Sequence, residues 1–113
     1  MFTTINLREL KNLMDYEESF VLVNVLDKSS FENERICGSI NIPLGDIKEA
    51  THRIKREETV VVHCSGPECT ASEAAAEELV KLGYKDVRRF QGGLKEWKAA
   101  GLCLEGRLHE KAA

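Results

Sequence analysis

The hydrophobic residues fall into two long runs that predict buried strands. Residues 20–25 and 59–63 are almost continuously apolar and rich in valine. A strand with one face in water alternates apolar and polar residues, whereas a strand covered on both faces does not. Shorter strands are predicted over residues 39–42, where Pro43 ends the run, and over residues 86–90. The two long runs should therefore be interior strands of one sheet.

Helical spacing lies between the strands. A capping box formed by Asn6 and Glu9 predicts a helix from residue 7. A second capping box, Thr70 with Glu73, predicts a helix through residue 82 that Gly83 closes in a left-handed conformation. A helix over residues 94–100 and weaker helical signals over 29–35 and 44–54 complete the set. The residues expected to pack are Leu7, Leu10, Leu13 and Met14 in the first helix and Ala74, Ala75, Leu79 and Leu82 in the second.

This alternation predicts an α/β fold, a small, mostly parallel and twisted sheet with helices on both faces. A chain of 113 residues fits a single domain, with its core over residues 5–105 and a polar, frayed C-terminal tail from Glu105. In such sheets ligands bind beyond the carboxyl ends of the strands. Cys64 follows the most apolar strand and lies at that end.

Charge and composition exclude several classes of function. The formal net charge is −3, and the lysines and arginines are dispersed, which argues against a nucleic-acid partner. No stretch approaches the roughly 18 apolar residues that span a bilayer, and the N-terminus lacks the features of a secretory signal. We therefore expect a cytoplasmic protein with no membrane partner, in which thiols stay reduced.

The four cysteines lack the spacing of a metal site, since no two of them form a C-x-x-C pair. Their number allows a disulfide framework, but a chain of this size can build its own core, so individual thiol chemistry is the better interpretation. Cys37 and Cys103 are expected to be packing or surface residues. No metal or cofactor is predicted.

The segment after the strand favours a reactive thiol at Cys64. We call residues 64–70 the Cys64 loop; after the cysteine it contains Ser65, Gly66, Pro67, Glu68, Cys69 and Thr70. Gly66 and Pro67 permit a tight reversal that points backbone N–H groups at the Cys64 sulfur. The start of the next helix adds N–H groups and the positive end of its dipole, and both lower the pKa of a thiol. Spacing alone is equally compatible with Cys64 as a small apolar residue that ends a strand.

Four stretches make the chain resemble the rhodanese family over residues 5–105. They are residues 20–26, residues 37–43, residues 60–64 with the Cys64 loop, and residues 91–97, in which Gly92 and Gly93 precede Trp97. The resemblance implies that Cys64 attacks a sulfane sulfur donor and holds the sulfur as a persulfide. Cyanide or another thiol then removes the sulfur, and no cofactor is needed. The family's six-residue active loop matches residues 64–69.

The Cys64 loop departs from the family at one position above all. Where the family usually carries arginine this chain has Cys69, and Glu68 adds a negative charge. Bidentate anion binding is a property of arginine, so we expect weak use of thiosulfate and a better fit for a persulfide, polysulfide or protein donor. Of the adjacent Arg88 and Arg89, strand alternation sends only one toward the site, where it would replace the missing cation.

Cys69 and the function as a whole leave alternatives open. Cys69 is either a small packed residue or a resolving thiol that attacks an oxidised or sulfur-loaded Cys64. The leading hypothesis is a sulfurtransferase whose partners are a small sulfur donor or persulfide-bearing protein and a thiol acceptor. The alternatives are a thiol redox or sensor protein using both cysteines, and a non-catalytic interaction module. His63 followed by Cys64 also resembles the cysteine phosphatases, but these enzymes need an arginine at the position of Thr70. His63 is instead expected to fill a site at the end of the strand.

Overall fold

A five-stranded parallel sheet forms the centre of the computed structural model, which describes residues 1–16 and 18–110. The strand order is β1-β6-β5-β2-β4, and every neighbouring pair runs parallel. The strands are β1 (Thr3–Ile5), β2 (Val21–Asn24), β4 (Ile40–Asn41), β5 (Thr59–His63) and β6 (Asp86–Phe90). The predicted α/β class and the four predicted strands are confirmed, whereas β1 was not predicted.

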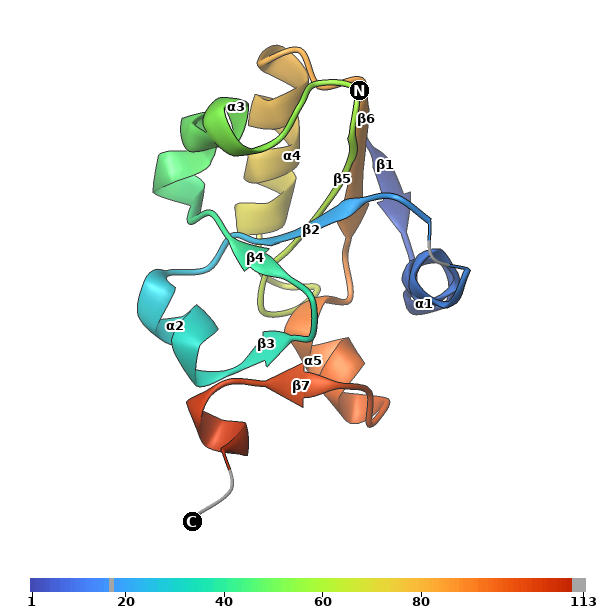
Figure 1. Ribbon diagram of the computed structural model, residues 1–113, viewed down its shortest axis with the longest axis vertical. Coiled ribbons are helices and arrows are strands. Elements are labelled where there is room, and N and C mark those ends of the chain that lie inside the picture. The colour runs from blue at the N-terminus through green and yellow to red at the C-terminus, as the bar shows by residue number, and fades with distance from the viewer. Residues whose placement is uncertain (17, 111–113) are drawn as a thin grey trace.

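Helices cover both faces of this sheet, as predicted (Figure 1). The α4 helix (Ala71–Lys81), the 3-10 helix η1 (Leu44–Glu49) and α3 (Ala50–Arg53) pack on one face, and α1 (Leu7–Asp15) and α5 (Gly93–Ala99) on the other. The short α2 (Lys28–Asn33) follows β2. Among the described residues, no helix is both long and apolar enough to cross a membrane.

The central strand β5 joins the two halves of the core. Val60 and Val62 pack into the cluster under α4, and Val61 packs into the cluster under α1 and α5. All three side chains are fully buried, and each contributes about 1.5–3 kcal/mol to folding through its removal from water. This burial holds rigid the end of β5 from which the Cys64 loop emerges.

The helix ends agree with the sequence at two of three predicted positions. The Asn6 side chain accepts from the Glu9 N–H at 2.9 Å, and the Asn6 N–H donates to the Glu9 carboxylate at 3.1 Å. Gly83 has a φ of +98° and ends α4 as predicted. The capping box at Thr70 is wrong: its backbone is already helical, with φ −91° and ψ −3°, and its side chain caps nothing. A capping side chain needs an extended backbone at that residue.

Packing on α4 also differs from the prediction. Ala75 and Leu79 are buried as expected and Leu82 is half-buried, but Ala74 is exposed, and Ser72 and Ala76 are buried instead. Ser72, Ala75, Ala76 and Leu79 follow the i, i+3, i+4, i+7 spacing of one helix face, so Ser72 lies on the side of the first turn that faces the sheet. The buried hydroxyl becomes important for the site below.

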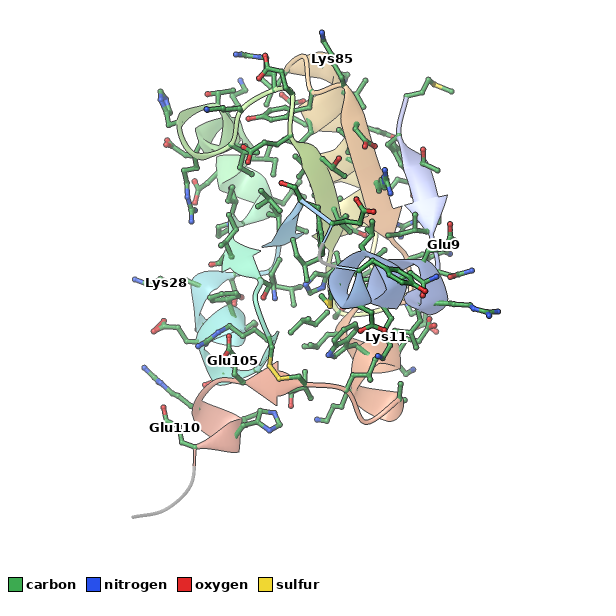
Figure 2. The ribbon with its side chains drawn as sticks, turned by 45° about the vertical axis from the view of Figure 1, so that its right-hand side comes forward. Glu9, Lys11, Lys28, Lys85, Glu105 and Glu110 are labelled. Carbon is green, nitrogen blue, oxygen red and sulfur yellow. A yellow bond between two sulfur atoms is a disulfide. The ribbon has the colours of Figure 1, made fainter. Side chains whose placement is uncertain are left out.

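The C-terminal segment is ordered, which corrects two predictions. β3 (Arg35–Ile36) pairs antiparallel with β7 (Leu104–Glu105), and the 3-10 helix η2 (Arg107–His109) follows. This pairing brings the Cα atoms of Cys37 and Cys103 to 5.6 Å, and the two cysteines form a disulfide, visible in yellow close to Glu105 in Figure 2. They are therefore not independent thiols. The tail, which was expected to be frayed from Glu105, is instead folded onto the domain through residue 110. Residues 111–113 lie outside the described part.

Side-chain contacts explain why this segment stays on the domain. The indole N–H of the buried Trp97 donates to the carbonyl of Cys103 at 2.8 Å. Glu34 accepts from Lys98 and contacts His109 at 2.8 Å. Although burial raises the pKa of Glu34, its hydrogen bonds with His109 and Lys98 outweigh burial and leave that pKa below its ordinary value. The segment thus depends on α5, the helix that also supports the Cys64 loop.

Candidate active site

Cys64 lies where β5 ends at the carboxyl edge of the sheet, and its side chain is only 1% exposed. The Cys64 loop reverses immediately, with the Cys69 N–H donating to the Gly66 carbonyl at 3.1 Å. The first turn of α5 holds the loop from outside: the N–H groups of Leu94 and Lys95 donate to the carbonyls of Cys64 and Ser65 at 3.0 and 2.8 Å. Backbone hydrogen bonds within the loop and from α5 therefore fix the position of Cys64.

The Cys64 sulfur contacts α4 and the far end of its own loop. Its thiol lies 3.4 Å from the Ser72 hydroxyl and 3.4 Å from the Cys69 carbonyl oxygen. Burial and the neighbouring Cys69 thiol raise the pKa of Cys64, and the Ser72 hydroxyl and N–H offset this only in part. The prediction that the loop lowers the pKa of Cys64 is thus wrong, because removal from water outweighs the N–H groups that reach its sulfur.

Cys69 is the more acidic thiol of the pair. Burial raises its pKa, but hydrogen bonds from the Cys64 thiol and from the N–H groups of Ala71 and Ser65 outweigh burial, so that the pKa of Cys69 lies below its ordinary value. The N–H groups that the sequence assigned to the Cys64 sulfur therefore converge on a different sulfur. The predicted reversal and helix start exist, and they lower the pKa of Cys69 rather than that of Cys64.

A buried guanidinium lies beneath the loop. Arg89 in β6 is 8% exposed, and its Nε donates to the Ser72 hydroxyl at 2.9 Å while its Nη2 donates to the Cys69 carbonyl at 3.2 Å. The Glu73 carboxylate is 3.9 Å away. Arg88 points to the other face and pairs with Asp86 at 3.0 Å. As expected, only one of the two arginines approaches the site; it is Arg89, which binds Ser72 and the Cys69 carbonyl and does not line the hollow at the loop mouth.

Arg89 should act on Cys64 through Ser72. Arg89→Met replaces the aliphatic stem of the side chain with one of similar length but removes the guanidinium, its charge and two charge-assisted hydrogen bonds, each worth about 1.5–3 kcal/mol. We expect the midpoint of Cys64 alkylation by iodoacetamide to move to higher pH, because the Ser72 hydroxyl and the Cys69 carbonyl lose the cation that polarises them. The measurement is the rate of alkylation against pH, with the modified cysteine located by mass spectrometry.

Arg88→Met is the matched control, since it removes the neighbouring arginine from the opposite face of the same strand. Its alkylation profile should equal that of the wild type. An unchanged profile for Arg89→Met would show that Arg89 only supports the packing of the loop.

The mouth of the loop is a small hollow of about 290 Å³. Five residues of the loop and one from α5 line it: Ser65, Gly66, Pro67, Glu68, Cys69 and Lys95. The structure therefore gathers the predicted loop residues except two: the exposed Thr70 and the buried Cys64 are not part of the lining. Lys95 supplies an exposed cation that the loop sequence itself lacks.

His63 does not contact the reactive sulfur. Its ring is fully buried, and Nδ1 lies 3.1 Å from the carbonyl oxygen of Cys64, so that this nitrogen donates. Burial lowers the pKa of His63 to about 4, and the ring is neutral near pH 7. Its position at the end of the strand agrees with the prediction. Among residues 1–16 and 18–110, no cluster of three or more His, Cys, Asp or Glu side chains could hold a metal.

Two contributors to the site were missed by the sequence reasoning. Ser72 lies within the predicted capping box of residues 70–73 and Lys95 within the predicted helix of residues 94–100, and neither was assigned a role at the site. The sequence does contain a signal for Ser72. In a strand–loop–helix unit, the first turn of the helix lies close to the end of the preceding strand, where Cys64 is. Lys95 carries no such local signal, because it reaches the loop across a separate helix.

Comparisons with known proteins agree with this arrangement. Residues 6–100 match the family model described as "Rhodanese-like domain". The chain is 29% identical over 83 residues to the thiosulfate sulfurtransferase GlpE of Coxiella burnetii, covering 74% of this chain and 76% of that protein. It is 27% identical to the putative sulfur carrier protein YrkF of Bacillus subtilis, with 82% of this chain and 49% of YrkF covered. The rhodanese-like domain of the Alr3790 protein from Anabaena superposes with a TM-score of 0.87 at 25% identity, over 99% of this chain and 85% of that one.

Proposed function

This chain belongs to the rhodanese-like family, and on that basis we propose that it is a sulfurtransferase that carries sulfane sulfur as a persulfide on Cys64. The supporting observation is the position of the Cys64 thiol, which is held at the end of β5 against Ser72 and beside an acidic second thiol. The donor is a small persulfide, a polysulfide or a persulfide-bearing protein, and the acceptor is a thiol or cyanide.

The reaction divides into two displacements. In the first, Cys64 loses its proton to the solvent, and the Cys64 thiolate attacks the sulfane sulfur of the donor. A sulfur–sulfur bond forms on Cys64 while the donor's own bond breaks and its remainder leaves as an anion. In the second, the acceptor attacks the outer sulfur and Cys64 leaves as a thiolate. The Ser72 hydroxyl and N–H face the Cys64 sulfur and stabilise that anion in both steps.

Turnover with cyanide separates the candidate functions. A sulfurtransferase forms thiocyanate with ping-pong kinetics, in which parallel lines appear in double-reciprocal plots. A thiol redox protein oxidises a reductant without forming thiocyanate. An interaction module with no chemistry does neither. Absence of thiocyanate with thiosulfate, persulfide and polysulfide donors would contradict the proposed function.

Weak use of thiosulfate is expected from the charges at the loop mouth. Arg89 is buried and already donates to Ser72 and to the Cys69 carbonyl. Among the residues that line the hollow, Lys95 is the cation left to bind the sulfonate end of thiosulfate, and it shares the hollow with the negatively charged Glu68. A charged hydrogen bond is worth about 1.5–3 kcal/mol, which corresponds to about tenfold or more in kcat/KM. We therefore expect Cys69→Arg to raise kcat/KM for thiosulfate by about tenfold or more.

Cys69→Ala is the control for loss of the thiol, and cysteine persulfide is the control donor because it carries no sulfonate. The gain for thiosulfate in Cys69→Arg should greatly exceed the change for cysteine persulfide. Equal thiosulfate efficiency in the wild type and in Cys69→Arg would refute the argument from loop charge.

A further inference from the structure

Two thiols share the Cys64 loop, and they differ in accessibility. The Cys64 side chain is 1% exposed and does not line the hollow at the loop mouth. Cys69 is half-buried and forms part of that lining, with Glu68 and Lys95 beside it. A thiol acceptor that enters from solvent therefore meets the Cys69 sulfur before that of Cys64.

The Cys64 sulfur lies against the residue that carries the second thiol. The Cys64 thiol donates to the Cys69 carbonyl oxygen at 3.4 Å, and the interaction between the two thiols lowers the pKa of Cys69. The reversal at Gly66 keeps the ends of the loop together, and its hydrogen bond from the Cys69 N–H is 3.1 Å long. An attacking group held in contact with its target by the backbone reacts at a high effective concentration.

We infer that Cys69 is an internal acceptor, which discharges the Cys64 persulfide by closing a Cys64–Cys69 disulfide and releasing hydrosulfide. The inference rests on the proposed function, since it needs a persulfide on Cys64. It adds a second outlet for the sulfur: an external acceptor takes it as sulfane sulfur, whereas Cys69 releases it as hydrosulfide.

The step balances within the loop. The Cys69 proton moves to the outer sulfur of the persulfide, and the Cys69 thiolate attacks the inner sulfur, Cys64 Sγ. A bond forms between the two cysteine sulfurs while the bond from Cys64 Sγ to the outer sulfur breaks. The outer sulfur leaves with both electrons of that bond and is reduced to hydrosulfide; the two cysteine sulfurs together are oxidised by two electrons. A dithiol reductant from outside the chain must reduce the disulfide before the next cycle.

The test compares the wild type with Cys69→Ser in a single loading without any external thiol. The donor is thiosulfate at saturating concentration, because every sulfur loaded leaves one sulfite and every discharge leaves one sulfide. Cys64 and Cys69 share the tryptic peptide Glu57–Lys81, in which an internal disulfide appears as a loss of two hydrogens and a persulfide as a gain of one sulfur. A wild-type sample without donor controls for air oxidation.

We expect sulfite from both proteins but sulfide from the wild type alone. The wild-type peptide should lose two hydrogens, and the Cys69→Ser peptide should keep one additional sulfur on Cys64. Sulfite without sulfide in the wild type, or additional sulfur on Cys69 itself, would overturn the inference and leave the proposed function standing. No additional sulfur in either protein after thiosulfate, persulfide or polysulfide treatment would overturn both.

Discussion

Cys64→Ser should lose sulfur loading and turnover by a factor on the order of 10⁴ or more, with little change in stability. The loss is large because a serine hydroxyl cannot form the sulfur–sulfur bond on which both displacements depend, and removal of a nucleophile eliminates the covalent route. Serine is close in size to cysteine, and its hydroxyl finds the same Ser72 hydroxyl and Cys69 carbonyl that now lie 3.4 Å from the sulfur.

The measurements are thiocyanate formation with cyanide and the free energy of unfolding in urea. We expect the free energy of unfolding to change by about 1 kcal/mol or less. Cys69→Ser is the matched control, since it removes a thiol from the same loop and should still load sulfur. The reverse pattern, with activity retained and stability lost, would make Cys64 a structural residue.

Gly93→Ala should strongly destabilise the protein at the Cys64 loop. Gly93 has a φ of +62°, and a Cβ there would lie 2.7 Å from the Cys64 carbonyl oxygen and 2.7 Å from the Gly66 nitrogen. Both are backbone atoms of the Cys64 loop, so the loop itself must move. The left-handed conformation costs about 1–2 kcal/mol for an L-residue, and the forced shift adds about 1–3 kcal/mol. Sulfur loading should fall as well, because the displaced backbone holds Cys64.

Gly101→Ala separates the two contributions. Gly101 also has a left-handed backbone, with a φ of +70°, but no atom lies within 4 Å of its would-be Cβ. Urea unfolding should show the conformational cost alone in Gly101→Ala and a clearly larger loss in Gly93→Ala. Equal losses in the two variants would mean that the contact between Gly93 and the Cys64 loop does not strain the protein.

The sequence was sufficient for the central strands and the position of Cys64. Unbroken apolar runs have one physical solution in a chain of this size, which is burial between two layers of helices. β5 and β6 therefore have the predicted bounds, residues 59–63 and 86–90. The edge strand β1 was not predicted, because Thr3–Ile5 is too short for alternation to be detected and pairs with a strand distant in sequence, β6.

The disulfide could not be predicted for a related reason. Cys37 and Cys103 are 66 residues apart, and only the two-residue pairing of β3 with β7 brings them together. Neither strand has a pattern of its own. Long-range contacts between such short elements depend on the completed fold rather than on local propensity.

The prediction of a lowered pKa at Cys64 was wrong, and the thiol with the lowered pKa is Cys69. The sequence pattern placed the N–H groups of the helix start around Cys64, since Cys64 directly follows the strand. The balance depends on how much water each sulfur retains, and Cys64 is 1% exposed whereas Cys69 lines the hollow. Burial of this kind follows from the three-dimensional path of the loop. Arg89 was within reach of sequence reasoning, because alternation along β6 sends only one of two adjacent arginines inward.

The most direct test of sulfur transfer through Cys64 is the mass of peptide Glu57–Lys81 from Cys69→Ser protein after exposure to a sulfane donor. In this variant the loop holds one thiol, so sulfur cannot leave through an internal disulfide. We predict a gain of one sulfur atom, located on Cys64 by fragmentation and removed by cyanide as thiocyanate. An unmodified peptide after thiosulfate, persulfide and polysulfide treatment would contradict the assignment of Cys64 as the sulfur-carrying residue.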